Sequence, residues 1–251
     1  MSDQAVTRRW DTEATRTLVH AQFGSLQLAL LAPPLRAVNY RLAHAQYHYL
    51  EWQRIVGAHV DNQLALGRDI CEIVFPSSSE EVMEHNLFFI ESEAHLYACV
   101  QAIHAAADNL AHVVYFGLGM NLGNAVAARD VSFHSMAAHL GQACSDDASL
   151  KSLADLFQQL KLADAFKDLS ELSNQMKHPG GPPANLALAP SAGQTHEMRF
   201  GNFIRAGQWH PERSASDLLE DAFRVVNVAV VDVGMALTHR LQTTVKDRRP
   251  A

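Results

Sequence analysis

The sequence has few cysteines and fewer basic than acidic residues. Its three cysteines, Cys71, Cys99 and Cys144, are widely spaced and form no Cys-x-x-Cys pair, so neither a zinc ribbon nor a disulfide framework is indicated. The 20 Lys and Arg residues against 27 Asp and Glu residues give a formal net charge of −7. This balance excludes a broad basic surface that binds nucleic acid or anionic membrane through charge alone.

Several catalytic and targeting motifs are also missing. The sequence contains no Gly-x-x-x-x-Gly-Lys-Ser/Thr loop and no Gly-x-Ser-x-Gly elbow, so neither P-loop nucleotide hydrolysis nor ordinary serine hydrolysis is indicated. The first thirty residues lack the apolar core of a signal peptide. The most apolar late segment, 225–237, contains Asn227 and Asp232 and is too short to span a bilayer. We therefore expect a cytoplasmic protein with no membrane partner.

Most of the chain shows apolar residues at three- and four-residue spacing, which is typical of helices packed on helices. A first long helix is predicted from about Leu35 to about Phe75, opened by Pro33 and Pro34. A second is predicted from about 80 to 117, behind a capping box made by Ser77 with Glu80 or by Ser78 with Glu81. Shorter helices are predicted over about 131–140, 148–160, 164–177 and, at the end, 217–245.

The segment before the last helix has a different composition. Residues 179–183 read Pro-Gly-Gly-Pro-Pro, which is incompatible with a helix, and alternating apolar residues from Leu186 to Phe203 predict a β-hairpin that turns near Gly193. We therefore predict an all-α fold, a helical bundle with long antiparallel helices and a small β-hairpin before the C-terminal helix. The predicted parts are an N-terminal extension (1–34), the bundle (35–178), the loop and hairpin insert (179–213) and the closing helix with its tail (214–251).

The segment that ends the helix near residue 177 carries the first candidate site. Asn174, Lys177 and His178 follow one another at i, i+3 and i+4, so they share one helix face. An amide, a cation and a nitrogen that titrates near neutral pH suit the binding of a phosphate with acid–base assistance. The alternative is a helix C-terminus, because Lys and His favour the negative end of the helix dipole and Pro179-Gly180 stops the helix.

This segment resembles the HEPN superfamily of compact helical bundles, whose motif is Arg-x4-6-His, often with Asn after the Arg. More narrowly, residues from about Glu80 to Val245 resemble an uncharacterised bacterial branch of that superfamily. The resemblance rests on Glu93–His104 within a long helix, on Asn174-x-x-Lys177-His178, and on a predicted hairpin containing Arg199–Arg205. It covers about two thirds of the chain and includes the closing helix.

The resemblance implies a homodimer and, in active members, RNA cleavage without a metal. Two protomers bring their motifs together, the His handles the proton of the ribose 2′-hydroxyl and the Arg steadies the phosphate. Here Asn174 and His178 match the motif, but Ser173 stands at the position of the Arg. Serine lacks the planar charged fork that grips a phosphate, although Lys177 could supply a point charge. Without such a substitute, the resemblance implies an inactive or repurposed member.

Two other pairs have the spacing of the motif. Arg129 and His134 follow a glycine-rich loop and open a predicted helix, and Arg54 and His59 lie within the first long helix. The alternative for Arg129 is a solvated residue near a helix start. We keep Arg129 and His134 as candidates for a catalytic role beside His178, Lys177 and Asn174.

Histidines and aromatic residues also follow helical spacing. His44, His48 and His59 share one face of the first long helix, and His104, Asp108 and His112 recur at i, i+4 and i+8 of the second. Such faces can hold a metal ion when they meet, but no Glu-x-x-His pair of the di-iron type occurs, so we predict no metal and no cofactor. We expect the aromatic residues Tyr40, Tyr47, Tyr49, Trp52, Phe88 and Phe89 to lie in the core.

The sequence thus supports one main hypothesis and two alternatives. The first is a HEPN-like helical homodimer that binds a nucleic acid, a nucleotide or a partner protein, in a bacterial defence or stress system. The second is a metal-independent ribonuclease with a composite active site at the dimer interface. The third is a metalloprotein, which requires the His44 and His104 faces to meet. Ser173 and the acidic charge favour the first hypothesis.

Overall fold

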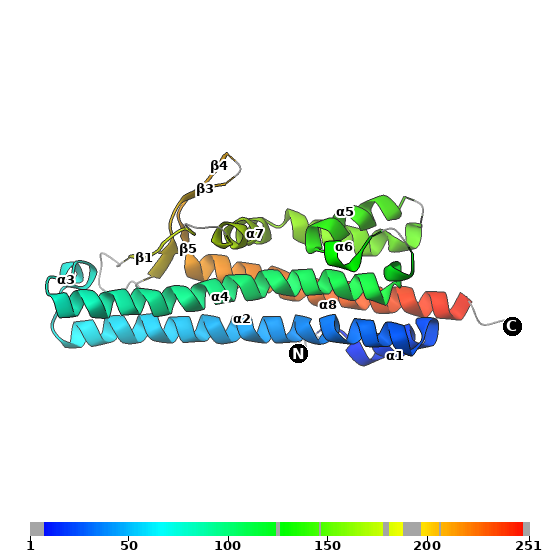
Figure 1. The fold of residues 1–251 in the computed structure, drawn as a ribbon, viewed down its shortest axis with the longest axis horizontal. Coiled ribbons are helices and arrows are strands. Elements are labelled where there is room, and N and C mark those ends of the chain that lie inside the picture. The colour runs from blue at the N-terminus through cyan, green and yellow to red at the C-terminus, as the bar shows by residue number, and fades with distance from the viewer. Residues whose placement is uncertain are drawn as a thin grey trace, which may run out of the picture. The chain divides into compact units, whose positions relative to one another are not determined.

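The computed structural model describes residues 8–123, 126–145, 147–177, 181–187, 197–205 and 207–247, which are mainly α-helical as predicted (Figure 1). Its α-helices are α1 (Thr12–Phe23), α2 (Ser25–Ala65), α3 (Ile70–Val74), α4 (Ser79–Gly117), α5 (Phe133–Ala143), α6 (Lys151–Leu162), α7 (Asp164–Met176) and α8 (Ala215–Asp247). Short 3₁₀ turns are η1 (Met120–Leu122), η2 (Ala128–Asp130) and η3 (Ala148–Leu150). The strands are β1 (Ala184–Ala187), β2 (Glu197–Phe200), β3 (Phe203–Arg205), β4 (Gln208–His210) and β5 (Arg213–Ser214).

The chain divides into two compact units that interleave along the sequence. Unit 1 comprises residues 1–42, 105–166 and 224–251, and unit 2 comprises residues 43–104 and 167–223. The long helices α2, α4 and α8 each contribute one part to unit 1 and another part to unit 2.

Unit 1 has an aromatic core between its short helices. The ring of Phe133 stacks on that of Phe157 at 5.3 Å and meets the edge of Phe166 at 4.8 Å. The backbone N–H of Phe133 donates to the Asp108 carboxylate of α4 over 2.9 Å, which ties the start of α5 to α4. Three large rings that are almost fully buried therefore anchor α5, α6 and the start of α7 in one core.

In unit 2, α2 and α4 form an antiparallel helical hairpin. His59 stacks on Phe88 with 3.9 Å between ring centroids. Further along, the Cys99 thiol donates to the backbone carbonyl of Ala45 over 3.3 Å. Because the two helices are antiparallel, contacting residues are closer together in sequence the nearer they lie to the turn.

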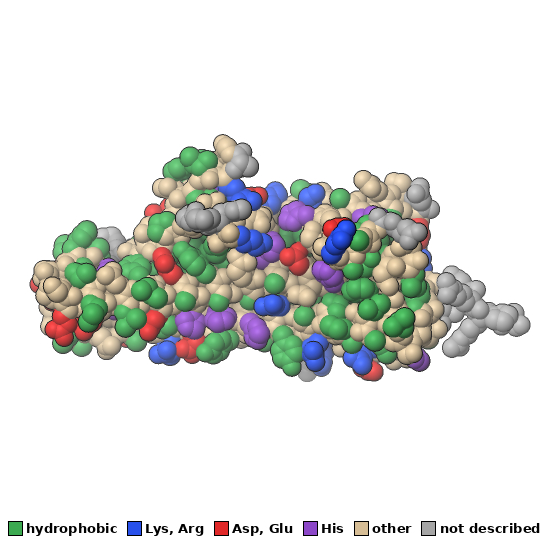
Figure 2. Space-filling view, viewed as in Figure 1, with side chains coloured by type: hydrophobic (Ala, Val, Ile, Leu, Met, Phe, Trp, Pro, Cys, Tyr) green, Lys and Arg blue, Asp and Glu red, His purple; other side chains and the backbone are tan. Residues whose placement is uncertain are grey.

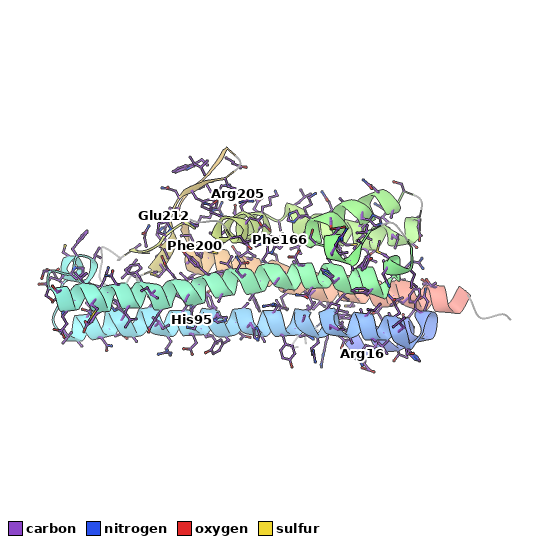
Figure 3. All side chains as sticks on the ribbon, viewed as in Figure 1. Arg16, His95, Phe166, Phe200, Arg205 and Glu212 are labelled. Carbon is purple, nitrogen blue, oxygen red and sulfur yellow. The ribbon has the colours of Figure 1, made fainter. Side chains whose placement is uncertain are left out.

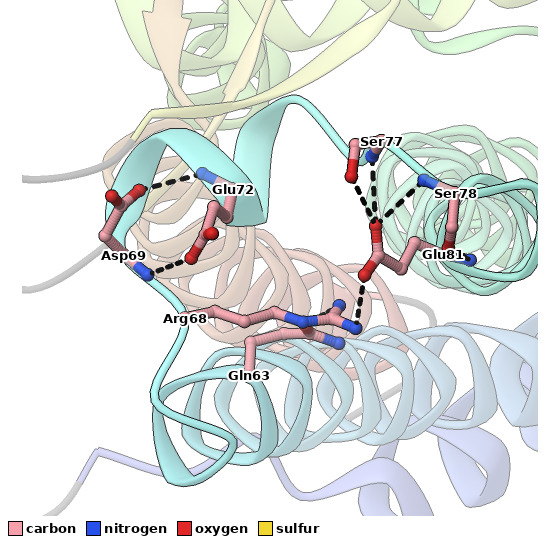
Figure 4. A network of polar contacts seen from close by, with 7 residues as sticks. All are labelled: Gln63, Arg68, Asp69, Glu72, Ser77, Ser78 and Glu81. Atoms are coloured by element: carbon pink, nitrogen blue, oxygen red, sulfur yellow. Dashed lines mark hydrogen bonds and ion pairs between the residues drawn. The ribbon is translucent and has the colours of Figure 1, made fainter.

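A polar network closes the turn of this hairpin (Figure 4). Gly67 ends α2 in the left-handed conformation, with φ of +76°, which glycine adopts without strain. Arg68 then reaches across to Glu81 of α4, with 2.9 Å between Nη2 and Oε1. The other carboxylate oxygen of Glu81 accepts the backbone N–H groups of Ser77 and Ser78, and Ser78 in turn accepts from the N–H of Glu81. The Ser78–Glu81 capping box predicted from the sequence is thus confirmed.

The strands form two small antiparallel sheets beside α7. The first has the order β1-β2-β5, with Ala184 opposite Phe200 and Arg199 opposite Ser214. The second is the β3–β4 hairpin, in which Ile204 pairs with Trp209. The first sheet confirms the predicted pairing around residues 186 and 198. The turn predicted near Gly193 lies outside the described residues.

The helix bounds correct the sequence prediction in the N-terminal third. α2 begins at Ser25, so Pro33 and Pro34 lie inside a helix and not at its start. Packing explains this difference, because Leu31, Leu35 and Val38 are buried on both sides of the prolines, and tertiary burial outweighs the backbone hydrogen bonds that proline removes. The predicted helix over 35–75 is also divided, since the break at Gly67 separates α2 from the short α3. Helix α1 and the β3–β4 hairpin were not predicted.

Helix α8 contains a long apolar segment. Among the described residues, its segment Ala215–Thr244 is the one that passes a test of length and apolar composition for crossing a membrane. Core helices of soluble proteins pass the same test. The buried residues of α8 recur at three- and four-residue spacing, as Val226, Val230, Val233 and Leu237 show, so one of its faces serves the protein core.

Gly234 of α8 offers a direct test of the core of unit 1. A Cβ at this position would lie 2.1 Å from Cδ2 of Trp10, whose indole N–H donates to Thr15 over 2.8 Å. We expect Gly234→Ala to lower the free energy of unfolding by about 1–3 kcal/mol, because the alanine overpacks a buried ring. Urea denaturation provides the measurement.

The matched control for this substitution is Gly141→Ala in α5. Nothing lies within 4 Å of a Cβ at position 141, so alanine should stabilise the helix there by about 0.5–1 kcal/mol. Equal stability changes in the two variants would contradict the packing of Trp10 against α8.

Candidate functional site

The C-terminal turn of α7 brings together two of the predicted site residues. The ammonium of Lys177 donates to the side-chain carbonyl of Asn174 over 3.4 Å, and this pair is exposed. The backbone N–H of Lys177 also donates to the carbonyl of Asn174, which shapes the last turn. His178, the third predicted residue, lies outside the described residues. The Asn174 amide and the Lys177 ammonium therefore lie together, as the sequence predicted.

Ser173, which stands at the position of the motif arginine, is fully buried. Its hydroxyl donates to the side-chain carbonyl of Gln101 over 3.1 Å, and the Gln101 amide donates to the backbone carbonyl of Ser173 over 3.0 Å. This reciprocal pair joins α7 to α4. An arginine at this position would bury a charge and leave Gln101 without its partner, which is costly. Ser173 thus has a structural role that excludes the grip on a phosphate.

A ladder of polar side chains on α4 holds the segment that carries the candidate site. Glu93, Tyr97 and Gln101 recur every four residues and contact, in turn, the N–H of Ala184, the carbonyl of Pro182 and the backbone of Ser173. Burial first, and the nearby Glu93 second, raise the pKa of Tyr97 to about 12, so its hydroxyl remains a donor at neutral pH. The ladder thus joins segment 93–104 to residues on either side of segment 174–178, namely Ser173 before it and Pro182 and Ala184 after it.

The arginines of the strands are held by carboxylates, and Figure 3 labels one of these arginines, Arg205, near α7. Arg205 of β3 lies 2.8 Å from Glu171 of α7, and Arg213 of β5 lies 2.6 Å from Asp168 of the same helix. Arg199 pairs with Glu197 and Glu212. These three arginines are therefore already neutralised, and a phosphate near α7 would have to displace a carboxylate to bind one of them.

The second predicted pair lies in unit 1. Arg129 of η2 has a side chain 88% exposed, with its Nε 3.7 Å from the carboxylate of Asp130. His134 follows at the start of α5, where its exposed ring stacks on Phe166 at 6.4 Å between centroids. Arg129 and His134 thus belong to a different unit from Asn174 and Lys177.

The third pair with motif spacing serves other contacts. Arg54 forms an ion pair with Glu51 one turn earlier, with 2.9 Å between Nε and Oε2. The ring of His59 is stacked on Phe88 in the helical hairpin. Both side chains therefore take part in helix packing and surface pairing within unit 2.

The histidines meet in a way that the sequence did not indicate. His48 of α2 faces His95 of α4, with 3.1 Å between their Nδ1 atoms, and Figure 3 shows His95 where α4 runs beside α2. Burial first, then His95 and His44, lower the pKa of His48 below its ordinary value. Within the residues that the structure describes, no group of three or more His, Cys, Asp or Glu side chains is placed to hold a metal ion.

Unit 1 contains a hollow of about 590 Å³ that is large enough for a small ligand. It is lined by Arg8, His239 and Arg240 among other residues. Arg8 lies 3.1 Å from Asp232, and Arg240 lies 3.1 Å from Asp147. The two arginines of this hollow are therefore paired, like those of the strands, and the hollow offers no preformed cradle for a nucleotide phosphate.

The sequence analysis missed the exposed apolar surface of unit 2. Trp52 and Phe88 are buried as predicted, but the prediction was wrong for Tyr40 and Tyr47, which are more than half exposed. At Phe75, which follows α3, and on the first half of α4, large apolar side chains point outward together with acidic ones, as Figure 2 shows. The exposed fractions are 75% for Phe75, 69% for Met83, 56% for Leu87 and 65% for Ile90. Their i, i+4, i+7 spacing on α4 was hidden in the sequence because the opposite face of the helix is apolar as well.

Comparison with protein-family models, with curated proteins and with solved structures gives no significant match to this chain. The geometry described above is thus the basis for functional inference.

The partly buried histidines of the hairpin predict a pH-dependent stability. Burial lowers the folded-state pKa of His48, His59 and His85 below the unfolded value of about 6.5. Between the two values the unfolded chain binds protons that the folded chain does not, so stability is complete above about pH 6.5 and falls as the pH falls through this window.

We expect the urea midpoint to be lower at pH 5.5 than at pH 7.5. His48→Gln should show a smaller drop, because it removes one of the three groups and frees His95 from its neighbour. The same fall in wild type and variant would show that the His48–His95 contact does not contribute.

Proposed function

We propose that this chain is a HEPN-like helical protein of the cytoplasm that acts by binding a partner protein. The observation that carries this proposal is the set of exposed large apolar side chains from Phe75, just after α3, to Ile90 on α4. Exposed apolar patches of this kind mark interaction surfaces in soluble proteins. Homodimer formation, and a place in a bacterial defence or stress system, belong to the same proposal.

The arrangement of the three resembling segments supports the HEPN-like assignment. The α4 segment 93–104 contacts the end of α7 through Gln101 and Ser173, and the β3 segment contacts α7 through Arg205 and Glu171. Segments far apart in the sequence are thus joined around the helix that carries Asn174 and Lys177. Contacts of this kind bear on the fold more than on a reaction.

Charge pairing favours a protein partner over a nucleic acid or a nucleotide. The strand arginines and the arginines of the unit 1 hollow are each held by a carboxylate. Binding of a phosphate backbone depends on free cations that replace counterions. The apolar side chains from Phe75 to Ile90, in contrast, are already exposed and can contact a protein without rearrangement.

A photo-crosslinker at position 87 tests the proposal in the cells that make the protein. We expect benzoylphenylalanine in place of Leu87 to give a discrete adduct with one other protein, identified by mass spectrometry. The same group in place of Leu162, which is 55% exposed in unit 1, is the matched control and should give no such adduct. Equal adduct patterns at both positions, or none at position 87, would count against a partner on this surface.

The alternative function is a metal-independent ribonuclease. The exposed Asn174–Lys177 pair beside position 178 is the observation that favours it. If this function holds, His178→Ala should abolish cleavage of a fluorescent single-stranded RNA by the purified protein, and Lys177→Ala should slow cleavage about tenfold or more. Cleavage that His178→Ala leaves unchanged would remove this residue from any catalytic role, and Arg129→Ala would then be the next variant to assay.

A further inference from the structure

The first half of α4 presents an apolar stripe with acidic side chains along one flank. The stripe consists of Met83, Leu87 and Ile90, which fall within about 60° of one another at 100° per residue. Glu80, Glu84 and Glu91 lie within about 40° of one another, next to the stripe. All six side chains belong to exposed residues. We call these six residues the acidic-apolar face.

The face has no basic counterpart nearby in the chain. No Lys or Arg occurs between Arg68 and Arg129, and seven Asp and Glu residues lie between positions 69 and 93. Arg68 itself is held by Glu81 and Gln63 in the turn. His85, one turn from the stripe, is partly buried, which lowers its pKa and keeps it neutral at pH 7. This part of α4 therefore carries an excess of negative charge, and its large apolar side chains are exposed in the part of the chain that the structure describes.

We propose that the acidic-apolar face binds a basic amphipathic helix of a partner protein. This inference rests on the proposed function and specifies the chemistry of the partner. A stripe at i, i+4 and i+7 matches the apolar side of a second helix laid along α4. Lys and Arg residues beside that apolar side would pair with Glu80, Glu84 and Glu91, which selects the partner and speeds its association.

A second copy of this chain is a poorer occupant of the same face. In an antiparallel two-fold pair of α4 helices, the flank that carries Glu80, Glu84 and Glu91 faces the same flank of the other copy. Carboxylates would then oppose carboxylates, and like charges across an interface destabilise it. The homodimer of the proposed function would therefore use another surface.

The test uses the full-length protein and two designed 18-residue peptides with the same leucine pattern. One peptide carries lysine on its polar side and the other carries glutamate, and each bears a fluorophore for anisotropy titration. We expect the lysine peptide to bind and the glutamate peptide not to bind. Leu87→Ser should weaken binding about tenfold, because one buried leucine is lost, whereas Leu162→Ser, a substitution of an equally exposed leucine in unit 1, should have no effect.

A second pair of variants isolates the charge. The triple variant E80Q/E84Q/E91Q should weaken binding about tenfold and reduce its dependence on salt. The triple variant E13Q/D130N/D155N, which removes three exposed carboxylates of unit 1, should bind as the wild type does. Thermal melts of each variant establish that it is folded.

The outcomes separate this inference from the proposed function. If the lysine peptide does not bind, or if both triple variants weaken it equally, the basic-helix inference is overturned even when Leu87 crosslinks to a protein in cells. If the peptide binds through the face but position 87 gives no adduct in cells, the chemistry of the face is supported and the proposed function fails. Protein that sediments as a dimer through this face, and loses it on Leu87→Ser, would assign the face to a second copy.

Discussion

The antiparallel register of α2 and α4 is the constraint on which unit 2 depends. Facing residues have numbers that add up to 143 or 144, as in the pairs Ala45–Cys99, His48–His95 and His59–His85. The turn at Gly67, closed by Arg68 and Glu81, sets this register. A shift of α4 by one residue would turn its core-facing side chains by about 100° and would separate all of these pairs together. The turn network therefore controls contacts that lie many residues away from it.

Once this register is set, different residues of α4 make different contacts. Phe88 and His95 face α2. The row of Glu93, Tyr97 and Gln101 holds the end of α7 and the start of β1. Met83, Leu87 and Ile90 remain outside, about 80–160° around the helix from Phe88 and His95 and close to the side of the Glu93, Tyr97 and Gln101 row, but nearer the start of the helix. A helix that is apolar on two sides is usually buried on both. The exposure of one side here is the physical reason to expect a partner.

Much of the architecture could be predicted from the sequence, and the failures have identifiable causes. Gly67, Pro76 and the Ser78–Glu81 box mark the ends of α2, α3 and α4 through local chemistry, which sequence reasoning reads well. Pro33 and Pro34 misled it, because burial of Leu31 and Leu35 outweighs a local rule. The His48–His95 contact joins residues on different helices and depends on the register of the hairpin. That register could have been derived from the turn, since an antiparallel hairpin centred near residue 72 places 48 opposite 95 or 96.

The position of Ser173 shows how a framework and a reaction can separate. The motif that the chain resembles places a charged arginine beside Asn174, yet this chain uses that position to join α7 to α4 through Gln101. The serine is fully buried, so an arginine at this position would require additional space and a new partner for Gln101. A single buried hydrogen-bonded pair thus makes the helical frame more secure while it removes the group that would hold a phosphate. Among the exposed surfaces of unit 2, the acidic-apolar face of α4 combines exposed apolar area with charge of one sign.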